Sequence, residues 1–454
     1  MKPLTIQYQT EKELFEIPHN GDAIIYAPLK RALFSANKNF VNFLCDMQAG
    51  VPVDVPGNKD TINRLKKLGI IHEKLELIEN STAKKTDKDY SQPFLPRNLT
   101  LFLTSDCNLA CRYCYGGGGD KRVNMPLEMA MDAIDFLFLN GAKSGTRQVH
   151  LGFHGGGEPV LRLRAMKRLV EHARRLSENR GIALTLGLTT NGVMTRDAAR
   201  WVLENIDQLN VSFDGPEDIQ NYQRPMKNGG DSFKRIAQTL RLWDAGEKRY
   251  NLRGTITQFS QDRIPEIVSC YLENFRPAGI HLEPMFFSSR AEKARINGPD
   301  HDSFVKGFAK AAKLAEKKGI DLHFSGHRFP KICNTFCGIG WKNFAVTPEG
   351  NVTSCFEVLA EEDRRSETFF FGKYVKNKGF RIDQRKIAAL RSLSETKLPF
   401  CDNCFAKFHC AGDCRAKGLY LNEISDFQGG GRCDIIRALT RFRLIEQLNL
   451  DEGE

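Results

Sequence analysis

The chain has 454 residues and a formal net charge of +11; 41% of its residues are apolar and 27% are charged. This balance is typical of a globular protein of about two to four domains, and no stretch approaches the roughly 18 to 20 apolar residues of a membrane span. The first residues, MKPLTIQYQTEKELFEI, contain acidic side chains and lack an apolar core, so we expect no secretory signal and a cytoplasmic protein.

The positive charge does not by itself indicate a nucleic-acid partner. Lysines and arginines are spread along the chain, as in Lys30-Arg31, Arg174-Arg175 and Lys317-Lys318, and most fall on predicted helices. Such residues usually form solvated helix faces, so we do not expect nucleic-acid binding. An acidic peptide segment is the alternative partner that this charge permits.

Residues 1–80 are predicted to form a small module of their own. The pattern predicts a strand, two helices and a strand, over residues 22–26, 37–48, 58–68 and 69–72. This order resembles the winged-helix domains with which peptide-modifying enzymes recognise a precursor peptide. A purely structural role in front of the next domain is the alternative. The polar residues 81–97 are predicted to be a linker.

Predicted strands and helices alternate over residues 98–320. The strands are Leu99–Thr104, Gln148–Phe153, Ala183–Leu188, Gln208–Phe213, Leu252–Thr257 and Gly279–Phe286. The helices are Leu127–Leu139, Leu163–Glu178, Arg196–Glu204, Phe233–Asp244, Ile264–Phe275 and Ser303–Lys318. Six such βα units indicate a parallel sheet and are too few to close an eight-stranded barrel. We therefore predict an α/β fold with an open, partial barrel, whose lateral mouth admits a large substrate.

Three cysteines follow the first of these strands with the spacing C-x3-C-x2-C. They are Cys107, Cys111 and Cys114, and Tyr115 comes next. A cubic iron–sulfur cluster takes four ligands, so three thiolates from one loop leave one iron open for a small molecule. A structural zinc site is the alternative, but it needs a fourth ligand that this loop does not contain. The loop lies at the carboxyl end of a strand, where α/β barrels carry their active sites.

The cysteine triplet followed by an aromatic residue resembles the signature of the radical S-adenosylmethionine (SAM) enzymes. The resemblance implies a partial barrel of six βα units, a 4Fe–4S cluster on the three cysteines, and SAM bound at the open iron. Motifs at later strand ends are also similar to those of this family. The SAM contacts that the resemblance implies are Tyr115, Gly156, Gly157, Glu158, Thr190, Asn191, Ser212 and Arg224.

Two of these motifs follow the second and third predicted strands. The run Gly155-Gly156-Gly157-Glu158-Pro159 is similar to the family motif that holds the SAM amino group, because glycines permit close approach and a carboxylate attracts an ammonium group. The run Thr189-Thr190-Asn191-Gly192 is similar to the family element near the ribose.

A third motif, after the fourth predicted strand, matches its family counterpart only in part. Ser212 and Arg224 are expected near the methionyl part of SAM, but Asn221 and Tyr222 stand where the related subgroup has His-Asp. The alternative for Arg224 and the nearby Asp214 is that they cap helices or pair on the surface.

Eight of the 13 cysteines lie between residues 333 and 433. They are Cys333, Cys337, Cys355, Cys401, Cys404, Cys410, Cys414 and Cys433. In a chain without an export signal such crowding favours metal ligation over disulfides, and eight thiolates suffice for two cubic clusters. Two four-cysteine zinc sites are the alternative. The isolated Cys45 and Cys270 have apolar neighbours, so we expect them to be buried and free.

Joined to a radical SAM core, this order of cysteines resembles the SPASM domain, which carries two auxiliary 4Fe–4S clusters. We expect this domain over residues 321–433, with a hairpin over 344–355, and a C-terminal helix over 434–454. The resemblance implies that Cys333, Cys337, Cys355 and Cys414 bind the first auxiliary cluster, and Cys401, Cys404, Cys410 and Cys433 the second. The chain would then hold three 4Fe–4S clusters.

The two resemblances imply an enzyme that cleaves SAM to a 5′-deoxyadenosyl radical and abstracts hydrogen from a ribosomally made peptide, forming a thioether or carbon–carbon crosslink. They imply two partners: a precursor peptide, with its leader bound by residues 1–80, and a reducing protein such as flavodoxin or ferredoxin. An iron–sulfur protein that only transfers electrons is the alternative of another class. A nucleic-acid-modifying radical enzyme is a further option that net charge alone suggests.

An anaerobic sulfatase-maturing enzyme, which makes formylglycine, is the alternative within the class. In that group an Asp directly follows the cysteine that corresponds to Cys355. Here Phe356 holds that position and Glu357 comes one residue later. On a strand, a shift of one residue turns the carboxylate to the opposite face, which weighs against this alternative unless the chain bulges at this point.

Overall fold

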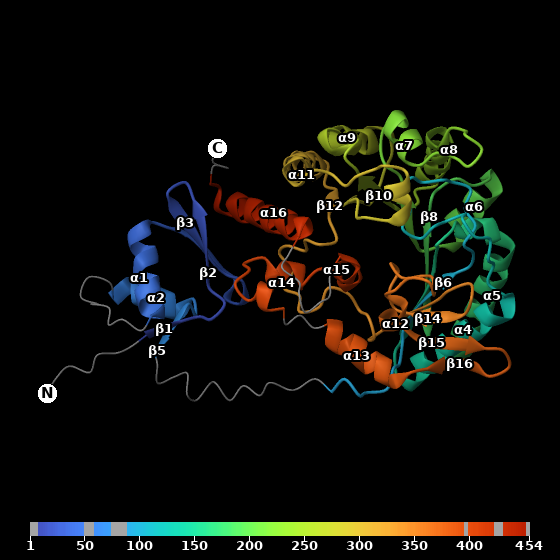
Figure 1. Cartoon of the computed structure of the whole chain (residues 1–454), viewed down its shortest axis with the longest axis horizontal. Coiled ribbons are helices and arrows are strands. Elements are labelled where there is room, and N and C mark those ends of the chain that lie inside the picture. Colours follow the sequence, from blue (N-terminus) through green and yellow to red (C-terminus); the bar gives the residue numbers. More distant parts are fainter. Residues whose placement is uncertain (1–7, 50–58, 74–88, 395–397, 422–429, 451–454) are drawn as a thin grey trace.

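A large open sheet forms the centre of the protein, as the computed structural model shows for residues 8–49, 59–73, 89–394, 398–421 and 430–450 (Figure 1). Its eleven strands stand in the order β12-β11-β10-β9-β8-β7-β6-β13-β14-β15-β16. The strands are β6 (Asn98–Phe102), β7 (Gln148–His154), β8 (Ala183–Thr190), β9 (Gln208–Ser212), β10 (Asn251–Ile256), β11 (Gly279–Pro284), β12 (Asp321–His323), β13 (Asn343–Val346), β14 (Asn351–Thr353), β15 (Phe370–Val375) and β16 (Gly379–Ile382).

Strands β6 to β12 are parallel neighbours, and helices cover their outer face (Figure 1). These helices are α4 (Leu127–Lys143), α5 (Leu163–Arg180), α6 (Arg196–Asn205), α7 (Glu217–Gln223), α8 (Ser232–Ala245), α9 (Ile264–Asn274) and α11 (His301–Glu316). The short helix α10 (Ser289–Lys293) lies beside the cysteine loop instead, where Arg290 donates to the carbonyl oxygen of Gly118. All six predicted strands and six predicted helices are present with nearly the expected bounds, so the predicted α/β partial barrel is confirmed. Strand β12 and the short helices α7 and α10 were not predicted.

Burial along the strands shows which face covers the core. In β10, Leu252, Gly254 and Ile256 are buried under the helices, while Arg253 and Thr255 point to the inside of the barrel. This alternation follows from the two-residue period of a strand. Polar side chains inside the barrel are therefore available to a ligand.

The cysteine-rich region extends the same sheet. The predicted hairpin forms β13 and β14, which pair antiparallel, and β13 also runs parallel to β6 with Val346 opposite Leu101. Strands β15 and β16 complete this edge. The other helices here are α12 (Ser366–Phe369), α13 (Gln384–Ser394), α14 (Lys407–Cys410), α15 (Arg415–Leu421) and α16 (Gly431–Leu448), the last standing where the C-terminal helix was predicted.

The N-terminal module contains more strands than its sequence predicted. Its elements are β1 (Tyr8–Thr10), β2 (Phe15–His19), β3 (Asp22–Ala27), β4 (Ala32–Ala36), α1 (Lys38–Gln48), α2 (Lys59–Lys67) and β5 (Ile71–Glu73). Strands β2, β3 and β4 form an antiparallel sheet, and β1 pairs with β5. The expectation that Cys45 is buried is wrong: Leu44 and Met47 face the core, which leaves Cys45 exposed on α1.

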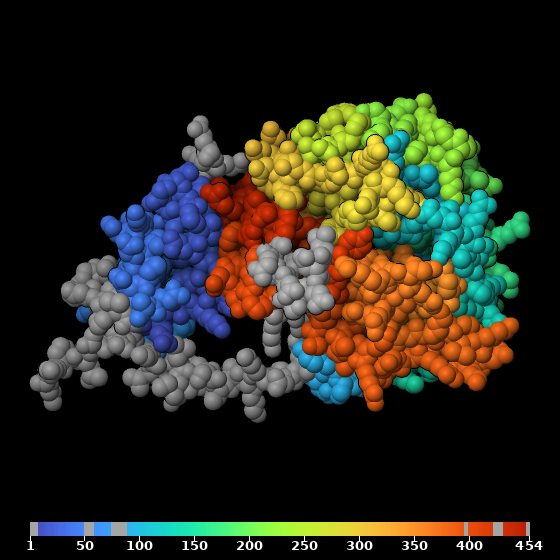
Figure 2. Space-filling model, viewed as in Figure 1, coloured from blue at the N-terminus to red at the C-terminus, as the bar shows by residue number. Residues whose placement is uncertain are grey.

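The N-terminal module packs against the C-terminal helix (Figures 1 and 2). Ile24 and Tyr26 of β3 form one apolar cluster with Leu444 and Ile445 of α16. Within this contact the Tyr26 hydroxyl lies 2.6 Å from Nε2 of His409, next to the predicted cluster ligand Cys410. The module is thus fixed to the cysteine-rich region by buried contacts. Across the described part of the chain, no helix combines the length and apolarity needed to span a bilayer.

Candidate functional site

The three cysteines after β6 belong to one loop and line one cavity. Cys111 is buried, and Cys107 and Cys114 are half-buried. The sulfur of Cys114 accepts a hydrogen bond from the backbone N–H of Gly118 at 3.4 Å, and that of Cys107 accepts one from Nδ2 of Asn191 at 3.6 Å. Burial raises the pKa of Cys107 to about 11 and that of Cys111 to about 12. As free thiols they are protonated at neutral pH, so binding a metal centre would release protons.

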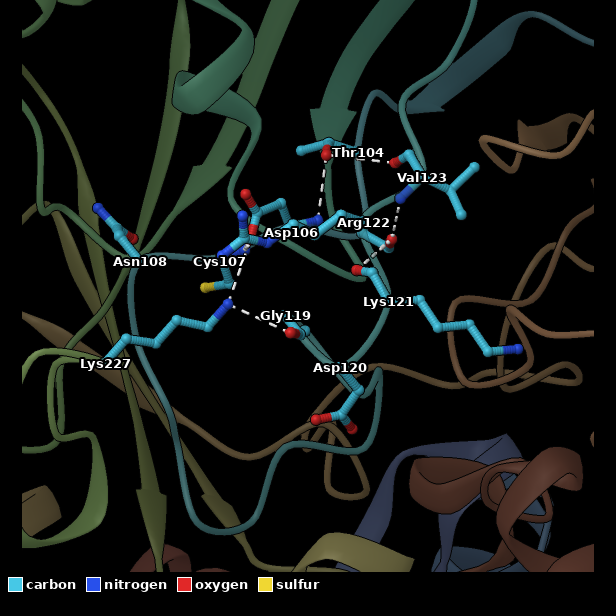
Figure 3. Close-up of polar contacts among 12 residues, drawn as sticks. Thr104, Asp106, Cys107, Asn108, Gly119, Asp120, Lys121, Arg122, Val123 and Lys227 are labelled. Atoms are coloured by element: carbon cyan, nitrogen blue, oxygen red, sulfur yellow. Dashed lines mark hydrogen bonds and ion pairs between the residues drawn. The ribbon is translucent and has the colours of Figure 1, made fainter.

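A lysine and an aspartate anchor this loop (Figure 3). The Oδ1 atom of Asp106 accepts from the backbone N–H of Cys107 at 2.9 Å, and the Nζ atom of Lys227 donates to the same oxygen at 3.2 Å. Lys227 also donates to the carbonyl oxygen of Gly119 at 3.2 Å. The Thr104 hydroxyl accepts from the backbone N–H of Asp106 at 3.0 Å. Both ends of the loop are therefore fixed around the cysteines.

The glycine run after β7 packs directly on the cysteine loop. A Cβ atom at Gly157 would lie 2.0 Å from the carbonyl oxygen of Asp106, and one at Gly118 would lie 2.5 Å from the carbonyl oxygen of Gly156. Real Cβ atoms do not come so close to backbone, so only glycine fits at Gly118 and Gly157. The two loops form one wall of the site.

We expect Gly157→Ala to lower the free energy of unfolding by about 1–3 kcal/mol, because the new methyl group forces the two loops apart. Gly156→Ala is the matched control, since a Cβ there would meet nothing closer than the Gly116 carbonyl oxygen at 3.3 Å. Urea denaturation of both variants measures the difference. Equal stability of the two variants would contradict the tight packing of these loops.

Glu158 ties the glycine run to the end of β8. Its Oε1 atom accepts from the Thr190 hydroxyl at 2.7 Å and from the backbone N–H of Val160 at 3.1 Å, and its Oε2 atom accepts from the backbone N–H of Asn191 at 2.7 Å. Burial raises the pKa of Glu158, against these hydrogen bonds. The sequence did not predict this anchoring role. Its contact with the SAM amino group stays a prediction.

One cavity of about 210 Å³ collects the predicted site residues at the carboxyl ends of the parallel strands. Its lining includes the three cysteines predicted to hold the first 4Fe–4S cluster and all of the predicted SAM contacts. These residues are Cys107, Cys111, Cys114, Tyr115, Gly156, Gly157, Glu158, Thr190, Asn191, Ser212 and Arg224. Sequence reasoning missed several further residues of its lining, among them Tyr113, Arg253, Glu283, Arg290 and Lys417.

Tyr113, Asp214 and Arg224 form a buried polar network beside the cysteines. The Tyr113 hydroxyl donates to Oδ2 of Asp214 at 2.6 Å and accepts from Nη1 of Arg224 at 2.9 Å. Asp214 and Arg224 are only 0% and 8% exposed, so the alternative that they pair on the surface is wrong. Burial raises the pKa of Asp214, while the nearby Arg224 opposes this.

These residues suit the groups that the resemblance implies. The loop offers three thiols, which is the soft donor set of an iron–sulfur cluster with one open iron. The Nε atom of Arg224 is buried and lacks a hydrogen-bond partner among the described residues, and it belongs to a side chain that lines the cavity. An arginine placed in this way can bind a carboxylate such as that of SAM.

The cysteines of the tail fall into two groups. Cys401, Cys404, Cys410 and Cys433 line one small cavity. In the other group, burial raises the pKa of Cys355, and nearby Cys414 and Cys337 raise it further. For Cys333 the structure gives a backbone contact, its N–H donating to the carbonyl oxygen of Phe408 at 2.8 Å. The assignment of these cysteines to two auxiliary clusters stays a prediction.

Glu357 does not lie where its position in the sequence suggested. Strand β14 ends at Thr353, so Cys355, Phe356 and Glu357 follow it in a bend. The expectation that the Glu357 carboxylate turns away is therefore wrong. Glu357 lines the same cavity as the cysteine loop, and it lies 3.7 Å from Nζ of Lys417. Phe356 packs on two aromatic rings of the barrel instead.

Comparisons with known proteins agree with this geometry. The profile of the radical SAM superfamily matches residues 101–246. A serine-type anaerobic sulfatase-maturating enzyme of Klebsiella aerogenes is 23% identical over 340 residues, which cover 68% of this chain and 77% of that protein.

Two solved structures share the fold. Native anSMEcpe with bound AdoMet and Cp18Cys peptide has a TM-score of 0.61 and 18% identity, and the match covers 78% of this chain and 99% of that one. SuiB of Streptococcus suis bound to its precursor peptide SuiA has a TM-score of 0.55 and 12% identity, and the match covers 93% of this chain and 99% of that one.

Proposed function

We propose that this chain, which contains a radical SAM domain over residues 101–246, is a peptide maturase that forms a thioether or carbon–carbon crosslink in a ribosomally made peptide. When bound, a 4Fe–4S cluster and SAM supply a 5′-deoxyadenosyl radical that abstracts hydrogen from the peptide. One observation carries the proposal: a single cavity is lined by the three cysteines, by every predicted SAM contact, and by Glu357 and Lys417 of the cysteine-rich region.

The chain's own residues position the reactants. Cys107, Cys111 and Cys114 would hold the cluster, and the glycine run with Glu158 would hold the amino group of SAM. Arg224 would hold its carboxylate.

The tail cysteines would hold two further 4Fe–4S clusters, three in all with the first. Cys355 lies two residues before the cavity-lining Glu357, which supports a position of the first auxiliary set near the cavity. A cluster held by these cysteines would supply an acceptor for the electron that the product radical loses when the crosslink forms. A flavodoxin or ferredoxin would supply the electron that starts each cycle.

The N-terminal module is proposed to bind the leader of the precursor peptide. The likeness of the whole chain to SuiB, whose structure was solved with a precursor peptide, supports this role, because the match covers 93% of the chain. The edge strands of its small sheets offer backbone groups to which an extended peptide can add. The buried contact between Tyr26 and His409 connects this module to the cysteine-rich region.

Formylglycine formation in a sulfatase is the second candidate function. A specific observation favours it: the Glu357 carboxylate lines the cavity after all, where it can take a proton from a substrate. The sulfatase-maturating relative of Klebsiella aerogenes also supports this candidate.

Co-expression with each short peptide that the neighbouring open reading frames encode, and with a sulfatase fragment, separates the two functions. A crosslink removes two hydrogen atoms from the peptide, and a thioether also leaves its cysteine unable to react with an alkylating reagent. Formylglycine instead reacts with a hydrazide. We expect the crosslinked product by mass spectrometry, together with 5′-deoxyadenosine. Reconstituted protein that makes no 5′-deoxyadenosine would contradict both functions and favour an electron-transfer protein.

A further inference from the structure

Four cationic side chains line the cavity, and one of them has no partner among the residues that the structure describes. They are Arg224, Arg253, Arg290 and Lys417. Three have partners: Arg224 on the Tyr113 hydroxyl at 2.9 Å, Arg290 on Asp120 at 2.5 Å, and Lys417 on Glu357 at 3.7 Å. Among the described residues, the Arg253 guanidinium has neither a hydrogen-bond partner nor an ion-pair partner.

The acidic side chains around the cavity do not compensate Arg253. The Glu158 carboxylate already accepts three hydrogen bonds, from the Val160 and Asn191 backbone N–H groups and from the Thr190 hydroxyl. Glu283 accepts from the Ser325 backbone N–H at 3.0 Å and lies 2.6 Å from Nε2 of His281. Arg253 is exposed and lines the cavity, so its guanidinium is accessible to an anionic group that enters.

Arg253 is held on a rigid element. It lies in the middle of β10, opposite Ser212 of β9 and His281 of β11, and its side chain points into the barrel. Burial, with a contribution from Arg253, lowers the pKa of the neighbouring His154 to about 4. His154 is therefore neutral at physiological pH. Arg253 is the cation that meets a ligand on this part of the barrel floor.

SAM does not account for this cation. SAM brings one carboxylate, and the amino-acid part that carries it belongs at the open iron beside the cysteine loop. Arg224 is held beside the cysteine loop by its hydrogen bond to the Tyr113 hydroxyl at 2.9 Å, and its buried Nε atom has no hydrogen-bond partner among the described residues. Arg253 instead projects into the barrel from the middle of β10, where its register partner on β11 is His281. A second carboxylate must therefore come from the other reactant.

We infer that Arg253 binds a carboxylate of the peptide substrate, either an Asp or Glu side chain or the C-terminus, and so sets which residue of the peptide enters the barrel. This inference rests on the proposed peptide-modifying function. The planar guanidinium can make two parallel hydrogen bonds to a carboxylate, which fixes orientation as well as charge.

The test uses reconstituted holoenzyme and the peptide encoded beside the gene. That peptide is also made with each Asp or Glu changed to Asn or Gln, and with an amidated C-terminus. We expect Arg253→Gln to raise the KM for the peptide by about tenfold to a hundredfold, with Arg253→Lys in between. With the natural enzyme, one of the neutralised peptides should have a KM raised by the same factor. Arg253→Gln should not raise the KM for that peptide any further. Arg241→Gln, at an exposed position of α8, is the matched control.

The affinity for SAM shows whether Arg253 binds a carboxylate of the peptide or the carboxylate of SAM. The Kd for SAM and the formation of 5′-deoxyadenosine without peptide should be the same in Arg253→Gln and in the natural enzyme. A weaker affinity for SAM with an unchanged KM for the peptide would overturn the inference and give Arg253 to SAM. An unchanged KM for every peptide would overturn it as well.

If the proposed crosslinking function is wrong, the experiment gives a different result from the one expected when only the Arg253 site is wrong. The natural enzyme would then release no crosslinked peptide at all. The carboxylate site is still tested in that case by the Kd of the fluorescently labelled peptide, which should rise in Arg253→Gln. An equal Kd for both proteins would contradict the site.

Discussion

Cys111→Ala is expected to reduce the formation of 5′-deoxyadenosine from SAM by more than about a hundredfold, since even changes behind the ligands of a metal site cost 10–100-fold. Cys111 is the buried cysteine of the triplet and lies between the half-buried Cys107 and Cys114. Removing it leaves two thiols in the loop, which cannot hold a cubic cluster with a single open iron. The measurement is chromatography of the nucleoside after anaerobic incubation with SAM and dithionite.

Metal content accompanies this measurement and has its own control. The variant should lose iron and inorganic sulfide in equal amounts, whereas Cys45→Ala, at an exposed position of α1, should lose neither. Thermal unfolding of both variants checks that the fold persists. If Cys111→Ala cleaves SAM at the natural rate, the cluster is not held by this loop. Zinc without sulfide in the natural protein would point to the structural zinc alternative.

Much of the barrel was predictable because each of its signals is local. Apolar runs such as Leu99–Thr104 fit the buried strands of a parallel sheet, and the motif residues follow directly at the strand ends. Parallel strands bring their carboxyl ends to one edge, so residues as far apart as Cys107 and Arg224 line one cavity. The resemblance to radical SAM enzymes, drawn from these residues, is confirmed by the family match over residues 101–246.

The remaining features depend on contacts that are distant in the sequence. Nothing near Asn343–Val346 indicates that this strand pairs with β6, more than two hundred residues earlier. The cavity position of Glu357 follows from where β14 ends, which alternation alone does not fix. Arg253 looked like an ordinary charged residue of a half-exposed strand. Its importance appears only when the partners of the other cations are known.

The second large effect is expected at Asp214. Asp214→Ala should lower the free energy of unfolding by about 3–5 kcal/mol, because it leaves the buried Arg224 without its acidic neighbour. The carboxylate also accepts from the Tyr113 hydroxyl at 2.6 Å, from Nε2 of Gln223 at 2.7 Å and from the Thr255 backbone N–H at 3.1 Å. These donors lose their partner together, and buried donors without partners are costly. Urea denaturation of the natural protein and the variant measures the difference.

Two further variants decide whether the uncompensated charge is the cause. In Asp214→Ala with Arg224→Met the buried cation is gone, so the double variant should regain part of the stability that Asp214→Ala loses. Asp218→Ala, which breaks the exposed ion pair of Asp218 with Arg263 at 2.5 Å, should cost less than about 1 kcal/mol. Purely additive losses in the double variant would show that the hydrogen bonds of Asp214, and not the charge of Arg224, dominate. The structure favours the charge, because Arg224 lies almost wholly out of water beside the thiols of the cysteine loop.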